Sequence, residues 1–211
     1  MHILRPFRPD DLSDIYQISV QTGDNGRDAT ALYDDPKLMG HIYSAPYLLL
    51  DPEHAIVVEY NDQVVGYVVG TLDTQNWEKR LEREWWPKLR HQYKAPDPAN
   101  RDQWTMDQIR IDRMHNPRLV DREISVRYPA HIHMNLLPIM QRRGIGTSLL
   151  KKWLSIAIKK GDRGLHVGAN PKNKDGIAFW QRSGFQTIST GHEKTPQTGW
   201  LGRSSMKIAS T

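Results

Sequence analysis

A short stretch in the second half of the chain has residue types and spacing that suit an anion. Gln141-Arg142-Arg143-Gly144-Ile145-Gly146 leads into Thr147, between a β-like run and an amphipathic helical run. Two glycines at a strand-to-helix junction let backbone N–H groups approach an anion closely, and the start of the helix adds its positive dipole end. The two arginines place mobile positive charge beside those donors. The stretch therefore predicts a pyrophosphate site.

Other glycine motifs fit this stretch less well. The dinucleotide fingerprint needs a third glycine, and that position is Leu149 here. A Walker A loop needs Gly-Lys-Ser/Thr after a longer glycine loop, and that sequence is absent. On spacing alone, a basic glycine turn that simply caps a helix stays as an alternative.

Two motifs carry a resemblance to a known family. Gln-x-x-Gly-x-Gly, with Pro138 three residues before Gln141, resembles the acyl-CoA-binding motif of the GCN5-related N-acetyltransferase (GNAT) family. Residues 173–185, with Asn173, Ile-Ala-Phe-Trp and Gly-Phe, resemble its second signature. Asn173 alone is a good N-cap and Gly184 a good C′ residue. Two such motifs in order favour the family.

The resemblance spans residues 3–208, and its specific part is residues 131–185. Residues 22–29 and 128–133 look like a bacterial branch related to the acetyltransferase-like C-terminal region of O-GlcNAcase. The family implies an α/β fold with helices on both faces of a mixed, twisted sheet of about seven strands. It also implies a splay between the fourth and fifth strands. We expect one domain over residues 1–211, with a helical insertion before the fourth strand at about 74–128.

The sequence patterns predict these elements locally. We expect strands at 2–5, 55–60, 64–72, 131–137, 164–169, 185–190 and 204–209, and helices at 10–20, 36–43, 146–160 and 173–183. Residues 75–115 read as two helices separated by the Pro-containing 95–98. Their apolar stripe (Trp77, Leu81, Trp85 or Trp86, Leu89) is typical of core, although one tryptophan facing an acceptor pocket stays open.

Two histidines precede the glycine motif. His131 and His133 lie on one face of the predicted strand, and Asn135 continues that face. An imidazole with an ordinary pKa of about 6.5 suits a general base. The catalytic candidates are His133, His131 and Asn135, and we expect His133 to be the base because it is nearer the β-bulge that the resemblance implies. A purely structural role remains the alternative. A metal site is not expected, because no third ligand follows with motif spacing.

The resemblance also implies roles for residues around the motif. A β-bulge at Leu136 or Leu137 would direct a backbone N–H at the thioester carbonyl, and aromatic residues of the second signature would line the thioester end. The acetyl-CoA-binding residues that we expect are Leu136, Leu137, Gln141, Arg142, Arg143, Gly144, Ile145, Gly146, Thr147, Asn170, Asn173, Phe179 and Trp180. The family often has a Tyr at the position of Trp180 as general acid, and indole cannot donate that proton.

The acceptor pocket in this family lies opposite the acyl donor. Its candidate residues here are Asp24, Arg27, Asp28, Tyr33, Asp73 and Trp77. Acidic residues among them would attract a cationic amine. The alternative is that Asp24-Asn25-Gly26 is only a polar turn.

Composition limits the remaining choices. Much of the net charge of +5 and of the pI of about 9.4 has a local source, because basic residues cluster around the predicted phosphate site. No nucleic-acid motif accompanies them, although a basic nucleic-acid-binding module stays as a rival. Zero Cys, no apolar run long enough for a membrane and no secretory pattern lead us to expect a cytoplasmic protein without a membrane partner.

The predicted function is transfer of an acetyl group from acetyl-CoA to a primary amine by direct attack, with CoA as product. The alternative is a catalytically inactive acetyl-CoA-binding protein, which Trp180 and Asn135 favour. The acceptor is not specified, and a homodimer stays open because the family often dimerises.

Overall fold

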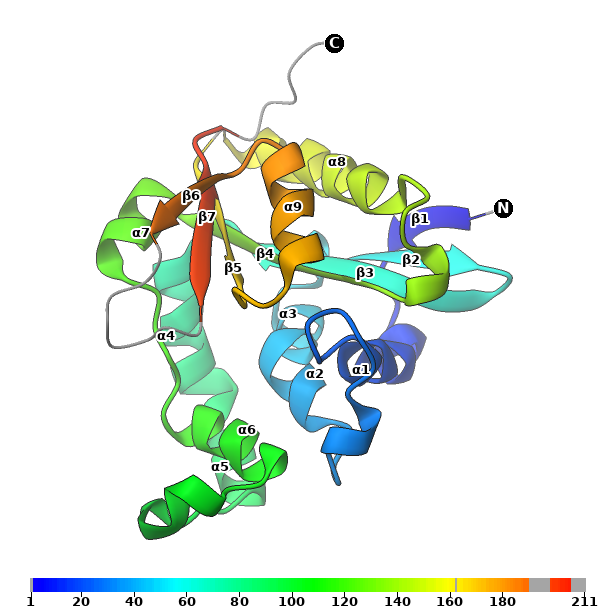
Figure 1. Ribbon diagram of the computed structural model, residues 1–211. Coiled ribbons are helices and arrows are strands. Elements are labelled where there is room, and N and C mark those ends of the chain that lie inside the picture. Colours follow the sequence, from blue (N-terminus) through cyan, green and yellow to red (C-terminus); the bar gives the residue numbers. More distant parts are fainter. Residues whose placement is uncertain (1, 162, 190–197, 206–211) are drawn as a thin grey trace.

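The computed structural model describes residues 2–161, 163–189 and 198–205 (Figure 1). Its centre is a seven-stranded mixed sheet in the order β1-β2-β3-β4-β5-β7-β6, in which β4 and β5 run parallel. The strands are β1 His2–Pro6, β2 Ile56–Tyr60, β3 Gln63–Thr71, β4 Ala130–Leu136, β5 Leu165–Ala169, β6 Gln186–Ser189 and β7 Gly199–Arg203. The α/β fold with about seven strands is confirmed.

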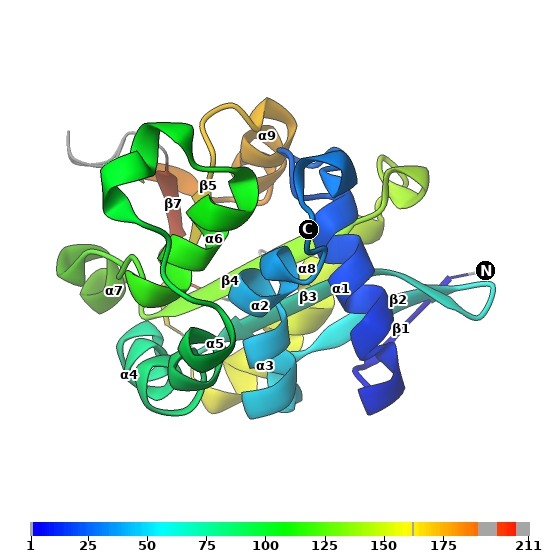
Figure 2. The ribbon, with the colours of Figure 1, turned by 90° about the horizontal axis from the view of Figure 1, so that it is seen from below.

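Helices cover both faces of the sheet (Figures 1 and 2). The helices are α1 Leu12–Gln21, α2 Leu38–Tyr43, α3 Ala45–Leu50, α4 Thr74–Glu84, α5 Trp86–Gln92, α6 Met106–His115, α7 Arg122–Arg127, α8 Ile145–Ala157 and α9 Lys174–Arg182. Helices α1 to α3 lie on one face, and α8 lies on the other. Helices α4 to α7 all come between β3 and β4, where the helical segment was expected.

Alternation along the central strands divides the interior into two cores. Val57 and Val69 are buried with the residues of α1 to α5, while Val58 and Val68 are buried with those of α8. Successive side chains of a strand point to opposite faces, so one strand supplies both cores. The β2–β3 hairpin that brings them together turns at Asn61 and Asp62, whose φ angles of 50° and 61° suit a type I′ turn.

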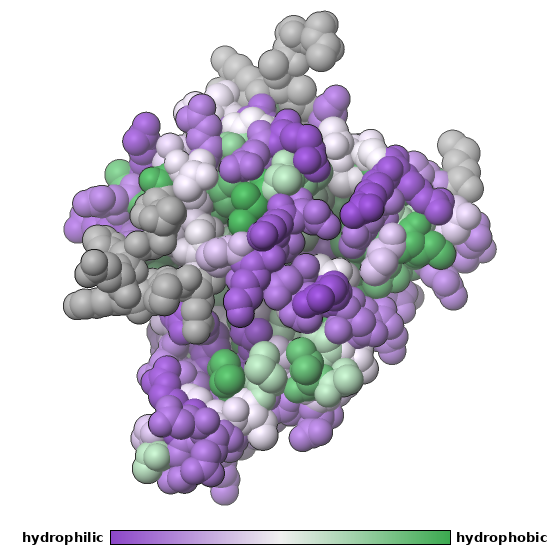
Figure 3. All heavy atoms as spheres, viewed as in Figure 1, coloured by the Kyte–Doolittle hydropathy of each residue, from purple (hydrophilic) through white to green (hydrophobic). Residues whose placement is uncertain are grey.

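The tryptophan-containing stripe is part of the first core. Trp77, Leu81, Trp85 and Leu89 are all buried, and the Trp85 indole donates to the His41 carbonyl at 2.9 Å. The stripe is core, as the sequence predicted, and it also fixes α4 and α5 against α2. The surface in Figure 3 is mainly hydrophilic, with apolar residues in small separate groups. No helix in the described ranges has the length and apolar character that a membrane crossing requires.

Several local expectations need correction. Residues 45–50 form α3 and residues 122–127 form α7, neither of which the periodicity suggested. A break at Trp85, two residues before Pro87, divides the first insert helix into α4 and α5. The strand expected at 204–209 lies mostly outside the described residues, and the described last strand is β7 at 199–203.

The bulge expected at Leu136 or Leu137 is absent. Pairing between β3 and β4 runs without a register shift from Thr71 with His131 to Gly66 with Leu136, and the Leu137 N–H donates to Val65 at 2.9 Å. The feature that opens the sheet is instead the short pairing of β4 with β5. Those strands pair at Ala130 with Leu165 and at His131 with His166, and beyond that they part. The splay between the fourth and fifth strands is confirmed.

Candidate active site

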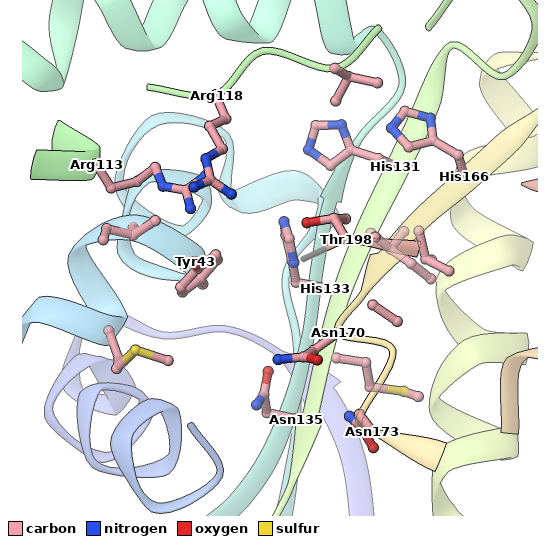
Figure 4. Close-up of a pocket in the computed structure, with 18 of the residues that line it drawn as sticks. Tyr43, Arg113, Arg118, His131, His133, Asn135, His166, Asn170, Asn173 and Thr198 are labelled. Carbon is pink, nitrogen blue, oxygen red and sulfur yellow. The ribbon is translucent and has the colours of Figure 1, made fainter. Parts of the chain in front are cut away.

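A cleft of about 1430 Å³ begins where β4 and β5 part. Residues 131–135 and 166–170 line it from the two strands, and the loop after α1, helices α2 to α4, helix α6 and the loop at 117–121 line the other side. Figure 4 shows His131 and His133 directed from β4 toward this space, with His166 beside His131. A large cleft with a few convergent polar groups is the usual form of a ligand site.

The glycine motif forms a left-handed turn at the start of α8. Gly144 is the N-cap with φ 75°, and Arg142 has φ 59°, so two nearby residues adopt the region that favours glycine. No side chain caps α8, and a Cβ added at Gly144 would meet nothing within 4 Å. The first N–H groups of a helix have no partner inside it. This helix start is therefore open to an anion.

Side chains around the turn keep it in place. Gln141 Nε2 donates to the Leu136 carbonyl at 2.8 Å, which ties the motif to the end of β4. Arg142 lies 3.6 Å from Asp175 of α9, and both side chains are about nine-tenths exposed, so that ion pair is weak. A Cβ at Gly146 would lie 3.3 Å from Phe179, so this glycine allows α9 to pack closely on α8.

The backbone of β4 directs two N–H groups into the splay. Because Leu137 N–H donates to Val65, the odd-numbered residues of β4 turn their N–H groups toward β3. The even-numbered residues turn theirs the other way, as the Ala130 N–H does when it donates to Gly164 at 3.1 Å. The N–H groups of Met134 and Leu136 therefore point to the side from which β5 has departed.

His131 is held on both ring nitrogens. The Thr74 hydroxyl donates to the Pro129 carbonyl, so it accepts from His131 Nδ1 at 2.7 Å. His131 Nε2 then accepts from the Tyr47 hydroxyl at 2.6 Å. Burial, then the neighbouring His166 and His133, lower the pKa of His131 well below its ordinary value. The ring is neutral, and its polar atoms are already used.

His133 also lines the cleft, and its ring nitrogens are open. It is half-buried, lies edge-on to Tyr43 at a ring-centroid distance of 6.0 Å, and has no hydrogen-bond partner among the described residues. Burial and the neighbouring His166 lower its pKa to about 4. A neutral imidazole with open nitrogens can accept a proton.

His166 completes the row but is fully buried. Its Nδ1 donates to the Tyr128 carbonyl at 2.6 Å, so its unprotonated Nε2 is buried without a partner. Burial lowers its pKa to about 4, against the opposing effect of that hydrogen bond. Within the described ranges, no three His, Asp or Glu side chains are grouped to hold a metal ion.

Comparison with known proteins identifies the family. The model of the acetyltransferase (GNAT) family matches residues 122–185, which include β4, the glycine turn, α8 and α9. A crystal structure called SsHAT is 33% identical, with a TM-score of 0.88, and the alignment covers 98% of this chain and 99% of that one. The chain belongs to the GNAT family.

More distant proteins share sequence or fold with this chain. Rat protein O-GlcNAcase is 22% identical over 204 residues, which are 97% of this chain and 22% of the rat protein. The chain thus spans about a fifth of the length of that curated relative. PaiA N-acetyltransferase of Thermoplasma acidophilum, crystallised with coenzyme A, shares the fold at a TM-score of 0.57 and 12% identity, covering 97% of this chain and 99% of that one.

The second GNAT signature lies along the other side of the splay. Asn173 caps α9 by accepting from the Gly176 N–H at 2.9 Å, and Asn170 accepts from the Lys172 N–H. Asn170, Asn173 and Trp180 all line the cleft. Trp180 is buried edge-on against Phe179 and Phe185, at centroid distances of 5.0 and 5.1 Å.

The residues expected around the acceptor lie in different places. Trp77 lines the cleft and stacks on Tyr47. Asp24 pairs with Arg27 at 2.9 Å, and Asp28 accepts from the Thr30 N–H, so these three residues hold their own loop together. Tyr33 accepts from Arg110 Nε, and Asp73 caps α4. These five residues lie outside the cleft lining.

Asn135 lines the cleft as well, and its side chain already makes a hydrogen bond within the protein. Its Nδ2 donates to the Thr22 hydroxyl, which in turn donates to the Ile18 carbonyl. The side chain thus links β4 to the end of α1 and holds that cleft edge together.

Sequence reasoning missed the most charged part of the cleft wall. Arg110, Arg113, Arg118, Tyr43 and Glu78 all line it. One signal was available, since Arg110 and Arg113 are three residues apart on a predicted helix and so share a face. Nothing in the sequence showed that this face turns toward β4.

Proposed function

We propose that this GNAT protein is an acetyl-CoA-dependent N-acetyltransferase that acts on a primary amine by direct attack. The observation that carries the proposal is the position of β4 at the splay. This strand directs the N–H groups of Met134 and Leu136 into the splay, and it directs the imidazole of His133 into the adjoining cleft. A donor for an oxyanion and an acceptor for a proton therefore come from neighbouring positions of one rigid element.

The start of α8 fits the pyrophosphate of acetyl-CoA. The N–H groups from Arg142 to Gly146 and the Thr147 hydroxyl would bind its oxygens, because the helix start is uncapped and the space beside Gly144 is open. The exposed Arg142 and Arg143 add positive charge. A hydrogen bond to a charged group contributes about 1.5–3 kcal/mol, so several such bonds can hold the group.

Acetyl-CoA supplies an activated acetyl group and a thiolate that can leave. The Leu136 N–H is the donor that we assign to the carbonyl oxygen, because the Leu137 N–H already binds Val65. One such donor can lower the barrier by about 2.7–4 kcal/mol. Asn170, Asn173, Phe179 and Trp180 would line the acyl arm from α9 and its preceding loop.

His133 is the proton acceptor in this proposal. As the amine nitrogen bonds to the acetyl carbon and the C–S bond breaks, the nitrogen would lose a proton to His133, and CoA would leave as the thiolate and then take a proton from solvent. His131 cannot take that proton directly, because Tyr47 and Thr74 occupy both of its nitrogens. We assign it the task of positioning β4. A thiol pKa of about 8.5 lets the sulfur leave without the tyrosine that Trp180 replaces.

The same proposal covers the domain as a whole. Residues 1–211 would form one GNAT domain, with 74–128 as an insertion whose helices close the acceptor side. A homodimer, which is common in the family, stays compatible with it.

The alternative is an acetyl-CoA-binding protein without turnover. Two observations favour it: Trp180 carries no proton to donate at useful pKa, and a pKa of about 4 makes His133 a weak base. Incubating the protein with acetyl-CoA and a panel of amines, while following free thiol, separates the two. Binding of CoA by calorimetry without thiol release from any amine would support the alternative.

A further inference from the structure

Three arginines line the cleft on the side opposite β4. Arg110 and Arg113 come from α6, and Arg118 comes from the loop that follows it. Figure 4 shows Arg113 and Arg118 reaching from separate backbone segments into the same space above Tyr43. Their charges act on each other: burial, Arg118 and Arg110 all lower the pKa of Arg113, although Tyr43 and Asp112 oppose the shift.

The hydrogen-bond partners of Arg110 in the cleft are neutral. Arg110 Nε donates to the Tyr33 hydroxyl at 2.9 Å, Nη1 donates to the Tyr43 hydroxyl at 3.3 Å, and the guanidinium lies over both rings. Arg113 has no hydrogen bond or ion pair among the described residues. Arg118 has a further interaction of its own. Phenol groups satisfy hydrogen bonds, but they do not neutralise positive charge.

Two carboxylates also line the cleft. Glu78 accepts from the Val120 N–H at 2.8 Å, and burial raises its pKa. Asp121 has a further interaction of its own. Arg110 and Arg113 are half-buried and face one cleft, and like charges placed in this way raise the free energy of the folded protein. A ligand oxyanion between two guanidinium groups would remove that cost, because guanidinium groups bind carboxylate and phosphate through paired N–H donors.

Tyr43 relates this cluster to the base. The ring centroids of Tyr43 and His133 are 6.0 Å apart, and the guanidinium carbon of Arg110 lies 5.8 Å from the Tyr43 ring centroid. A ligand whose anion reaches the arginines would therefore extend past Tyr43 to bring a second group to His133.

We propose that the acceptor is a small amine that carries an oxyanion, a carboxylate or a phosphate, on the same molecule. The oxyanion would bind Arg113 and Arg118, and the amine would lie at His133. This inference rests on the proposed acetyltransferase function. It places the acceptor among amino acids, amino-sugar phosphates and similar compounds, and it disfavours polyamines and lysine side chains inside a protein.

The first test is a matched acceptor panel with saturating acetyl-CoA. Each pair of compounds shares one amine and differs in a second group, which is neutral in the first member and anionic in the other. The pairs are β-alanine amide with β-alanine, ethanolamine with 2-aminoethyl phosphate, and glucosamine with glucosamine 6-phosphate. A diamine is the cationic member. We expect kcat/KM for the better anionic form to exceed that of its neutral form at least tenfold, and the carboxylate and phosphate arms to show which oxyanion is preferred.

The second test uses Arg113→Met, with Arg101→Met as its control. Arg101 lies over Trp104 on the same insertion but outside the cleft. We expect Arg113→Met to bring the anionic-to-neutral ratio of kcat/KM close to one, and Arg101→Met to leave it as in the wild type. Equal use of neutral or cationic amines by the wild type would overturn the inference while leaving the acetyltransferase function intact.

A binding measurement decides the inference even if no amine turns over. With CoA present, thermal shifts are measured for each panel member on the wild type, Arg113→Met and Arg101→Met. We expect the anionic amines to raise the Tm of the wild type and of Arg101→Met but not that of Arg113→Met. The Tm of free Arg113→Met should equal or exceed that of the wild type. Two outcomes would refute the inference: the anionic amines raise the Tm of Arg113→Met as much as that of the wild type, or they do not raise the Tm of the wild type. Absence of thiol release with every amine would count against the proposed function alone.

Discussion

His131 of β4 and His166 of β5 face each other at the last position where the two strands pair, with ring centroids 5.5 Å apart. Beyond this pair the strands separate and the cleft begins. Both rings are tied to backbone carbonyls on the buried side, His131 through Thr74 to Pro129 and His166 directly to Tyr128. The pair therefore lies at the base of the cleft, and His133, two residues along β4, is the next ring that faces it.

Gly144→Asp should remove CoA binding. An aspartate at the N-cap of α8 places negative charge where the pyrophosphate would lie, so we expect CoA affinity to fall by about a hundredfold or more in calorimetry. Gly184→Asp is the matched control, because Gly184 also has a positive φ, 85° against 75°, but it follows the C-terminal end of α9 and not the start of a helix. Both variants should lose similar stability from backbone strain, on the order of 1–2 kcal/mol. Equal loss of CoA affinity in both would mean that strain, and not the anion site, is the cause.

His133→Ala and His131→Ala should separate chemistry from structure. We expect His133→Ala to lower kcat by about 10²–10⁴-fold, the usual contribution of a general base, with CoA affinity retained. His131→Ala leaves the Tyr47 hydroxyl and Thr74 without their buried partner, so it should lower the free energy of unfolding by about 1–3 kcal/mol. Thiol-release kinetics and urea unfolding measure the two effects. Unchanged turnover in His133→Ala would exclude it from the mechanism.

The pH dependence of turnover should follow the acceptor. With a pKa of about 4, His133 is already neutral throughout the range from pH 6 to 9, so its protonation should cause no change of kcat/KM in that range. The amine must lose its ammonium proton before it attacks, so kcat/KM should rise with pH up to the pKa of the acceptor. For two acceptors of the same charge whose amine pKa values differ by more than one unit, the rise of kcat/KM should extend to a higher pH for the acceptor with the higher amine pKa. A rise that ends near pH 6.5 for both would instead indicate that an unperturbed histidine controls the rate.

The sequence predicted those parts of the site that depend on neighbouring residues. Gly144 and Gly146 specify the turn and the close approach of α9 locally, and two-residue alternation placed His131 and His133 on one face. The arginine cluster could not be predicted in this way, because it needs α6 to pack across from β4. Arg110 meets Tyr33 and Tyr43, which are 77 and 67 residues earlier in the chain. Asp24 and Asp28 in the loop after α1 were expected at the acceptor pocket because of their negative charge, but they pair with residues of the same loop.

Backbone direction was equally hidden from the sequence. Whether Leu136 or Leu137 offers a free N–H depends on which residue faces β3, and the side chains, both leucine, do not reveal it. The bulge implied by the family would have left that choice open. The regular register decides it, because the hydrogen bond from Leu137 to Val65 fixes the parity of the whole strand.

Acid should destabilise the fold through two histidines whose pKa values are lowered in the folded protein. His133 and His166 have folded-state pKa values of about 4, against about 6.5 for an unfolded chain. Between those values the unfolded chain binds more protons, so stability is complete above pH 6.5 and is lost as the pH falls toward 4. The slope is about 1.4 kcal/mol per pH unit for each such histidine.

His166→Asn keeps a donor for the Tyr128 carbonyl but cannot titrate, so its unfolding free energy should fall less steeply with falling pH than that of the wild type. The exposed His91 is the control, and His91→Asn should leave the slope as it is. Urea unfolding at several pH values between 4 and 7 measures the slopes, and parallel curves for the wild type and His166→Asn would show that burial of His166 does not couple folding to protonation.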